Sequence, residues 1–124
     1  MSIEDIRDYC LGLPYAAEAM PFDDRILVFK VGGKWFAVVD LDAGSKVVVK
    51  CDPDLAIELR DRHEEITPAW HFNKRHWYAV RLDGDLTPQF IYEQIKNSYM
   101  LVVQKNVTPR ALRIEILAAN DNRP

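Results

Sequence analysis

Apolar residues recur along this chain with two different periods, and the change of period separates helices from strands. The first helix is predicted by apolar residues at helical spacing, namely Ile3, Ile6, Cys10 and Leu13. Ser2 precedes them as an N-cap, and Asp5 stands three residues later, as in a capping box. Gly12 and Pro14 follow, so we expect the helix to end there.

A hairpin is predicted after this helix, where the apolar pattern becomes short and rich in β-branched residues. The run "ILVFKV" (26–31) is joined to "KWFAVVDL" (34–41) by Gly32 and Gly33. A two-residue Gly-Gly loop accepts the positive φ angles of a type I′ turn, whose twist matches the flanking strands. The turn "DAGS" then leads into a further strand, "KVVVK" (46–50).

Two more helices are predicted where a capping side chain precedes a proline. Asp52-Pro53 begins one that extends to about Arg62, and Thr87-Pro88 begins a longer one that ends near Lys105. Between them lie two short extended runs, around residues 66–70 and 77–82.

The element order is therefore α-β(3-4)-α-β(2)-α, which predicts a two-layer α+β domain with helices on one face of a mostly antiparallel sheet. We assign residues 1–106 to this domain and 107–124 to a partly ordered C-terminal extension. Residues 109–118 suit a helix or a strand equally well. Their apolar side chains are expected to dock on the domain or on a second copy, and residues 120–124 to be loose. These apolar residues are Leu112, Ile114, Ile116 and Leu117.

The net charge of the chain is small, but the charged residues are unevenly distributed along it. The net charge of −3 excludes a general basic field that would draw the whole protein onto nucleic acid or anionic lipid. Residues 1–24 carry six acids against Arg7 alone, whereas residues 66–82 carry Lys74, Arg75 and Arg81 and no acid. No apolar run approaches the length of a membrane span, and Cys10 and Cys51 are single and far apart. We therefore expect a cytoplasmic monomer or weak homodimer with reduced, half-buried thiols and no membrane association.

The stretch "TPAWHFNKRHWYAV" (67–80) holds most of the chemically distinctive side chains. His71 and His76 stand five residues apart across a loop, with no Glu or Cys nearby, whereas zinc needs three or four converging ligands. The chain has no Gly-x-Ser-x-Gly elbow and no glycine-rich phosphate loop. We expect no metal, no cofactor and no catalytic residue, and hence no enzyme. The three tryptophans are expected to be packing anchors, with Trp77 in the core.

Four segments together resemble the MmcQ/YjbR family of small bacterial proteins over about residues 5–106. They are "LVFKVGGKWFAVVDL", "VVVKCDPDLAIELRDRH", "PAWHFNKRHWYAVRLDGDL" and "IYEQIKNSYMLVVQK". The family commonly has Met and Lys where this chain has Phe72 and Arg75. The resemblance implies a YjbR-like two-layer fold, similar to secretion chaperones and frataxin-like domains. It also implies DNA binding, by analogy of fold.

Three hypotheses on function stay open. The leading one is a non-enzymatic DNA-binding module, in which cations beside aromatic rings contact phosphates and bases. Its candidate residues are Lys50, His71, Asn73, Lys74, Arg75, His76 and Arg81. The second is a protein-binding adaptor that acts through an exposed sheet or helix face. The third is a small-ligand or enzyme site beneath the histidine-bearing loop.

Overall fold

The computed structural model describes residues 1–69 and 72–122, and within them it has four helices and six strands. The helices are α1 (Ile3–Leu11), α2 (Pro53–Arg62), α3 (Pro88–Lys105) and α4 (Arg110–Asp121). The strands are β1 (Ala16–Ala19), β2 (Ile26–Val31), β3 (Lys34–Asp40), β4 (Lys46–Lys50), β5 (Ile66–Pro68) and β6 (Trp77–Arg81). The predicted order is confirmed with four strands before α2, and α4 is an additional helix at the C-terminal end.

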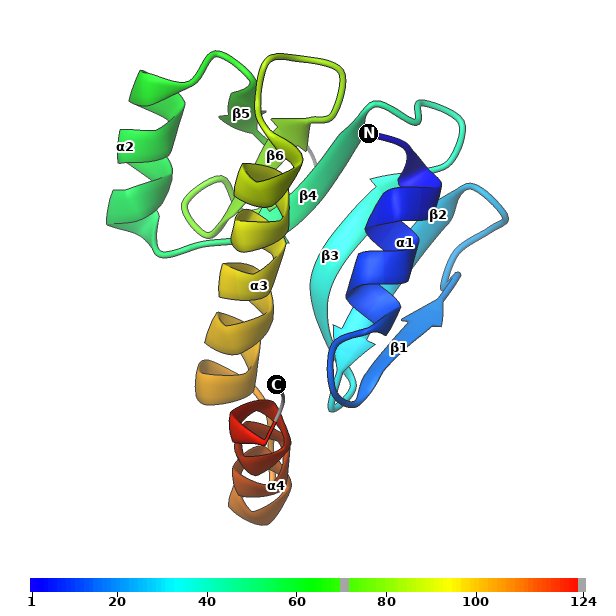
Figure 1. Ribbon diagram of the computed structural model, residues 1–124, viewed down its shortest axis with the longest axis vertical. Coiled ribbons are helices and arrows are strands. Elements are labelled where there is room, and N and C mark those ends of the chain that lie inside the picture. The colour runs from blue at the N-terminus through cyan, green and yellow to red at the C-terminus, as the bar shows by residue number, and fades with distance from the viewer. Residues whose placement is uncertain (70–71, 123–124) are drawn as a thin grey trace.

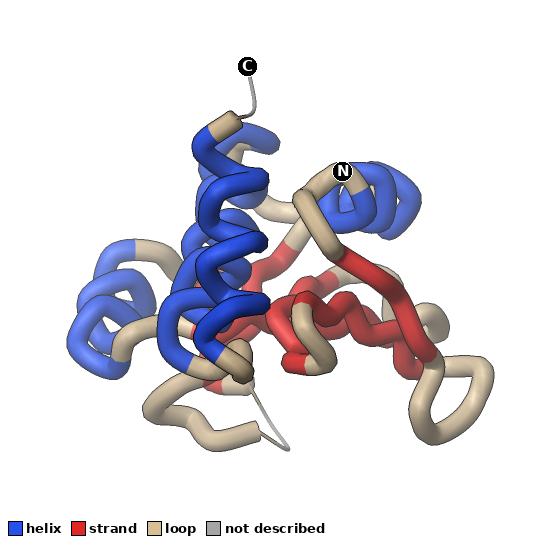
Figure 2. Tube along the Cα trace, turned by 90° about the horizontal axis from the view of Figure 1, so that it is seen from below, coloured by secondary structure: helices blue, strands red, loops and turns tan. Residues whose placement is uncertain are grey.

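The strands form one sheet in the order β1-β2-β3-β4-β6-β5, and every neighbouring pair is antiparallel. Chain order is broken once, because α2 carries the chain past β4 to the sheet edge and β6 returns between β4 and β5 (Figure 1). The helices gather on one side of the sheet, while loops occupy the other (Figure 2). The two-layer α+β fold predicted from the sequence is therefore confirmed.

Local sequence signals explain where three helices begin. Ser2 and Asp5 form the predicted capping box, in which the Asp5 amide donates to Ser2 Oγ at 3.2 Å and the Ser2 amide donates to Asp5 Oδ2 at 2.9 Å. The Asp52 side chain caps α2, and Thr87 Oγ1 accepts from the amide of Phe90 at 3.1 Å to cap α3. Each cap satisfies an amide that would have no partner within its helix.

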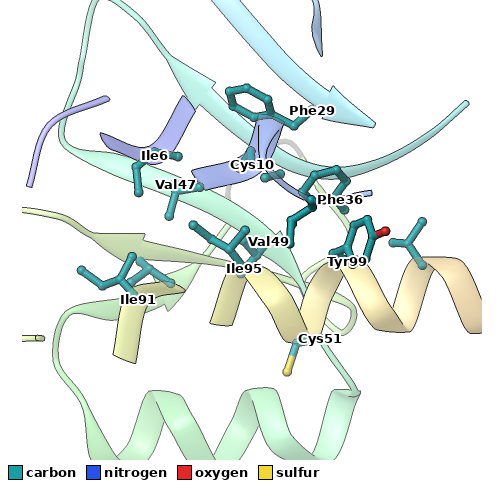
Figure 3. Packing of buried hydrophobic residues seen from close by; sticks show 14 of the residues in the cluster. Ile6, Cys10, Phe29, Phe36, Val47, Val49, Cys51, Ile91, Ile95 and Tyr99 are labelled. Atoms are coloured by element: carbon teal, nitrogen blue, oxygen red, sulfur yellow. The ribbon is translucent and has the colours of Figure 1, made fainter. Parts of the chain in front are cut away.

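The hydrophobic core lies between the helices and the sheet, and α3 crosses its centre (Figure 3). Phe36 of β3 and Tyr99 of α3 are both fully buried and meet edge to face, with ring centroids 5.3 Å apart. Ser98 Oγ donates to the Phe36 carbonyl at 2.6 Å and accepts from the Lys50 amide at 2.8 Å. The Cα register between β3 and β4 ends at Ala37 and Val49, so this hydroxyl links the two strands beyond their last paired residues.

The C-terminal segment forms helix α4 rather than a strand, which settles the alternative left open for residues 109–118. Ile116 is fully buried in the core, and Leu112 and Leu117 pack against it, as expected. Ile114 does not dock on the domain, because it is 52% exposed, and its docking on a second copy stays a prediction. The expectation of a loose end from residue 120 was also wrong for Asn120, whose amide nitrogen donates to Tyr99 Oη at 3.0 Å.

Gly32 and Gly33 form the predicted turn between β2 and β3, with φ angles of +56° and +78°. We expect Gly33→Ala to lower the free energy of unfolding by about 1–2 kcal/mol, the cost of a left-handed backbone with a Cβ atom. Gly32→Ala should cost about 1–3 kcal/mol more, because its Cβ would lie 2.8 Å from Cγ1 of the buried Val107. Urea denaturation of both variants measures the difference.

The two glycines are matched controls for each other, since both have positive φ and nothing lies within 4 Å of a Cβ built on Gly33. Equal decreases in stability in the two variants would show that the contact with Val107 relaxes freely.

Candidate nucleic-acid interface

The face of the sheet opposite the helices carries a row of cationic and aromatic side chains on β4 and β6. Side chains alternate along each strand, so the buried Val47, Val49, Tyr78 and Val80 point to the helices and their neighbours point away. In the register between the strands Lys46 stands opposite Arg81, Val48 opposite Ala79, and Lys50 opposite Trp77. Cations therefore occupy both ends of the row and small aliphatic side chains its centre.

Lys50 is held at one end of this row by contacts with β6, with α3 and with Asn106, the residue that follows α3. Its Nζ donates to Asn106 Oδ1 at 2.9 Å and lies 6.0 Å from the ring centroid of Trp77. Its backbone amide donates to Ser98 on α3. The ammonium group is thus positioned by a neutral amide and an aromatic ring, and no carboxylate within the described ranges neutralises it.

The loop before β6 is a compact turn built around Asn73. The Asn73 side-chain oxygen accepts from the Arg75 amide at 3.0 Å, and its carbonyl accepts from the amides of His76 and Trp77. Arg60 of α2 donates to the Lys74 carbonyl at 3.2 Å and ties the loop to the helix. Asn73 therefore shapes the turn, and the side chains of Lys74 and Arg75 are left exposed at its tip.

The aromatic residues beside this turn belong to the helix-free face rather than to the core. Trp77 is half-buried and packs against Phe72, with ring centroids 5.3 Å apart. The expectation that Trp77 anchors the core was wrong, since alternation turns it outward and the adjacent Tyr78 is the buried residue. Tyr78 Oη donates to Gln94 Oε1 at 2.8 Å. Trp70 and His71 lie outside the described residues.

A hollow of about 430 Å³ opens on the same face, between the β3–β4 turn and Phe72. Its floor includes Val38 and Val48, and Lys46 and Arg25 stand at its rim. Arg25 pairs with Asp40 at 2.6 Å, and this hydrogen-bonded guanidinium lowers the pKa of the Asp40 carboxyl to about 2. The hollow thus combines an apolar floor with a cation, Lys46, that forms no ion pair within the described ranges.

The structure brings together most of the residues that the sequence singled out. Lys50 and the segment 73–76 lie at one end of the β4–β6 row. Arg81 lies at the other end, roughly 13 Å away at about 3.3 Å per residue, and it pairs with Asp83 at 3.1 Å. Lys46 was missed, although its spacing of four from Lys50 in "KVVVK" places both on one face of a strand.

The described residues include two buried cysteines and no cluster of metal ligands. No group of three or more His, Cys, Asp and Glu side chains among them could hold a metal ion. Cys10 and Cys51 were expected to be half-buried, and both are buried. Desolvation raises the pKa of Cys10 to about 12 and that of Cys51 to about 11. Both are therefore thiols at neutral pH, which are poor nucleophiles. None of the described helices combines the length and the apolar character that crossing a membrane requires.

Comparison with known proteins agrees with the fold and with the four resembling segments. The sequence model of the YjbR family matches residues 11–101. The uncharacterised protein YjbR of Escherichia coli strain K12 is 34% identical over 114 residues, covering 91% of this chain and 95% of its own. The uncharacterised protein YbdF of Escherichia coli O157:H7 is 30% identical over 114 residues, covering 86% and 93%.

Two crystal structures share the architecture. The Deinococcus radiodurans protein DR2400 superposes with a TM-score of 0.84 at 37% identity, over 93% of this chain and 87% of its own. A protein from Pseudomonas syringae superposes with a TM-score of 0.70 at 27% identity, over 82% and 98%. With a family model that spans most of the chain and relatives matched over nearly their whole length, this protein belongs to the YjbR family.

Proposed function

We propose that this protein is a non-enzymatic DNA-binding protein that contacts the phosphate backbone with the helix-free face of its sheet. The observation that carries the proposal is the β4–β6 register, which places Lys46 beside Arg81 at one end and Lys50 beside Trp77 at the other. The exposed Lys74 and Arg75 extend the second end. The two cationic ends are roughly 13 Å apart, which equals about four base-pair rises of 3.4 Å along the axis of B-DNA.

The overall charge of −3 does not oppose this proposal, because the field that DNA meets is local. Six acids lie in the first 24 residues, and Glu4, Asp5 and Asp8 among them belong to α1, which covers the opposite face of the sheet. Contacts to phosphates position a protein on DNA without reading its sequence. We therefore infer binding of modest affinity, little sequence preference and strong dependence on salt.

The test is the charge reversal Lys74→Glu with Arg75→Glu, measured by fluorescence anisotropy on duplex DNA at several salt concentrations. We expect weaker binding on every sequence and a salt dependence of log K that is flatter by about 0.9 for each phosphate that the variant no longer neutralises. Stability should change by less than about 0.5 kcal/mol, because both side chains are exposed.

Arg110→Glu with Arg113→Glu is the matched control, since it changes the net charge equally but lies on α4, away from the sheet face. It should leave the salt dependence as it is. If the two double variants bind alike, the loop before β6 makes no specific phosphate contact and the proposal fails.

A further inference from the structure

A cleft lies between α2 and α3, at the end of β4, and Lys50 is the residue that it shares with the proposed DNA contact. It consists of two adjoining pockets of about 230 and 140 Å³ that share Lys50, Cys51, Asp52 and Leu101. Figure 3 shows the Cys51 sulfur directed from the strand end into the region between the two helices. The third hypothesis drawn from the sequence placed a small-ligand site beneath the histidine-bearing loop, and this is where that loop meets the cleft.

Three residues with nitrogen-bearing side chains line the larger pocket, and they come from three different elements. Lys50 ends β4, His76 belongs to the loop before β6, and Lys105 stands in the last turn of α3. Within residues 1–69 and 72–122, neither lysine has a carboxylate at ion-pair distance. The acid that lines the pocket, Asp52, accepts from the amides of Asp54 and Leu55 as the cap of α2. The pocket therefore carries a net positive charge that no described carboxylate neutralises through an ion pair.

The positions of the donors and the other residues that line the two pockets indicate which class of ligand the cleft would bind. Donors supplied by three separate elements suit the tetrahedral oxygens of a phosphate better than the planar oxygens of a carboxylate. The adjoining pocket is lined by Leu55 and Leu101 with the side-chain amides of Gln94 and Asn97, so it offers apolar surface and polar contacts to a small organic body. The thiol of Cys51 is neutral at physiological pH, because burial raises its pKa to about 11, and adds no negative charge.

We propose that the cleft between α2 and α3 binds a terminal phosphate group, that of a phosphomonoester, through Lys50, His76 and Lys105. The site shares Lys50 with the proposed contact with duplex DNA, whereas Lys105 and the α2 and α3 residues that line the cleft take no part in that contact. A phosphomonoester has two sources, a free nucleotide or the phosphorylated end of a nucleic-acid strand. The two share the chemistry that these side chains recognise.

The test is a titration of the ¹⁵N-labelled protein with adenosine 5′-monophosphate, followed by amide chemical shifts, with adenosine as the control ligand. We expect saturable shifts at the start of α2 and the end of α3 with the monophosphate only. Lys105→Gln should weaken this binding about tenfold, since it removes a charge-assisted hydrogen bond. Lys34→Gln, at an exposed lysine that begins β3, should leave it unchanged.

Two further measurements are needed. One distinguishes a free nucleotide from the phosphorylated end of a strand, and the other distinguishes this site from the proposed duplex contact. The first measurement compares a single-stranded oligonucleotide that has a 5′-phosphate with its 5′-hydroxyl form. If the phosphorylated form binds more tightly, and Lys105→Gln abolishes this preference, the ligand is the phosphorylated end of a strand. If the two oligonucleotides bind equally and the monophosphate binds saturably, the ligand is a free nucleotide. Lys105→Gln should leave duplex binding unchanged, and Lys74→Glu with Arg75→Glu should leave monophosphate binding unchanged. No saturable shift with the monophosphate, or equal affinity in Lys105→Gln, overturns the site.

Discussion

Replacing Tyr99 by alanine is expected to lower the free energy of unfolding by about 3–5 kcal/mol, the cost of removing a large aromatic side chain from a core. Tyr99 is fully buried against Phe36. Its hydroxyl donates to the Pro14 carbonyl at 2.6 Å and accepts from Asn120 at 3.0 Å. One side chain thus joins the segment between α1 and β1, strand β3 and helix α4 to α3. Urea denaturation followed by circular dichroism measures the decrease.

Tyr99→Phe separates the ring from the hydroxyl. It keeps the packing on Phe36 and leaves the Pro14 carbonyl and the Asn120 amide without the hydroxyl as a partner, which should cost about 1–3 kcal/mol. If Tyr99→Phe is as destabilising as Tyr99→Ala, the hydrogen bonds rather than the ring hold this junction. An alanine variant that is destabilised by less than about 1 kcal/mol would contradict the packing of Tyr99 on Phe36.

Deleting residues 110–124, and with them α4, is expected to cost at least about 3 kcal/mol. Burial of Ile116 alone contributes about 1.5–3 kcal/mol, and Leu112 and Leu117 add partial burial. The deletion also removes Asn120, whose side chain accepts from Lys96 Nζ at 3.1 Å besides donating to Tyr99. Core surface on α3 would be exposed, so we expect a lower unfolding midpoint and association detectable by analytical ultracentrifugation.

If the truncated chain does not fold, point variants on α4 still test whether this helix stabilises the core. Ile116→Ala should cost about 2–5 kcal/mol, whereas Ile114→Ala should change stability by less than about 0.5 kcal/mol because its side chain is 52% exposed. A truncated protein with an unchanged midpoint and an unchanged oligomeric state would show that α4 is dispensable.

The fold was predictable from the sequence where the signals are local. Ser2, Asp52 and Thr87 cap the helices that their positions indicate, and the Gly32-Gly33 turn joins β2 to β3. The C-terminal segment was not predictable to the same degree, because its apolar spacing fits two periods and its starting residue makes no side-chain cap. Contact with the core then selects the helical form and decides that Ile116 is inside and Ile114 outside.

The candidate interface was predictable in composition and only partly in arrangement. Lys50, Lys74, Arg75 and His76 were identified from their residue types, and they do lie together near Trp77. Arg81 was identified too, but it lies at the opposite end of β6, where Lys46 is its neighbour. The pairing of β6 with β4 decides which cations lie at the same end of the row. Local sequence patterns do not indicate which strand pairs with which.

By itself the sequence determined the helices, the turns and which strand residues share a face, because capping, glycine turns and alternation act between residues close in the chain. Only the tertiary structure decided which of these faces meet. Lys50 reaches Asn106 across 56 residues, and Ser98 reaches Phe36 across 62. The cleft that gathers Lys50, His76 and Lys105 exists because α3 packs across the strand ends and α2 leaves the sheet there. Such contacts arise from the packing of whole elements around one core, which many residues determine together.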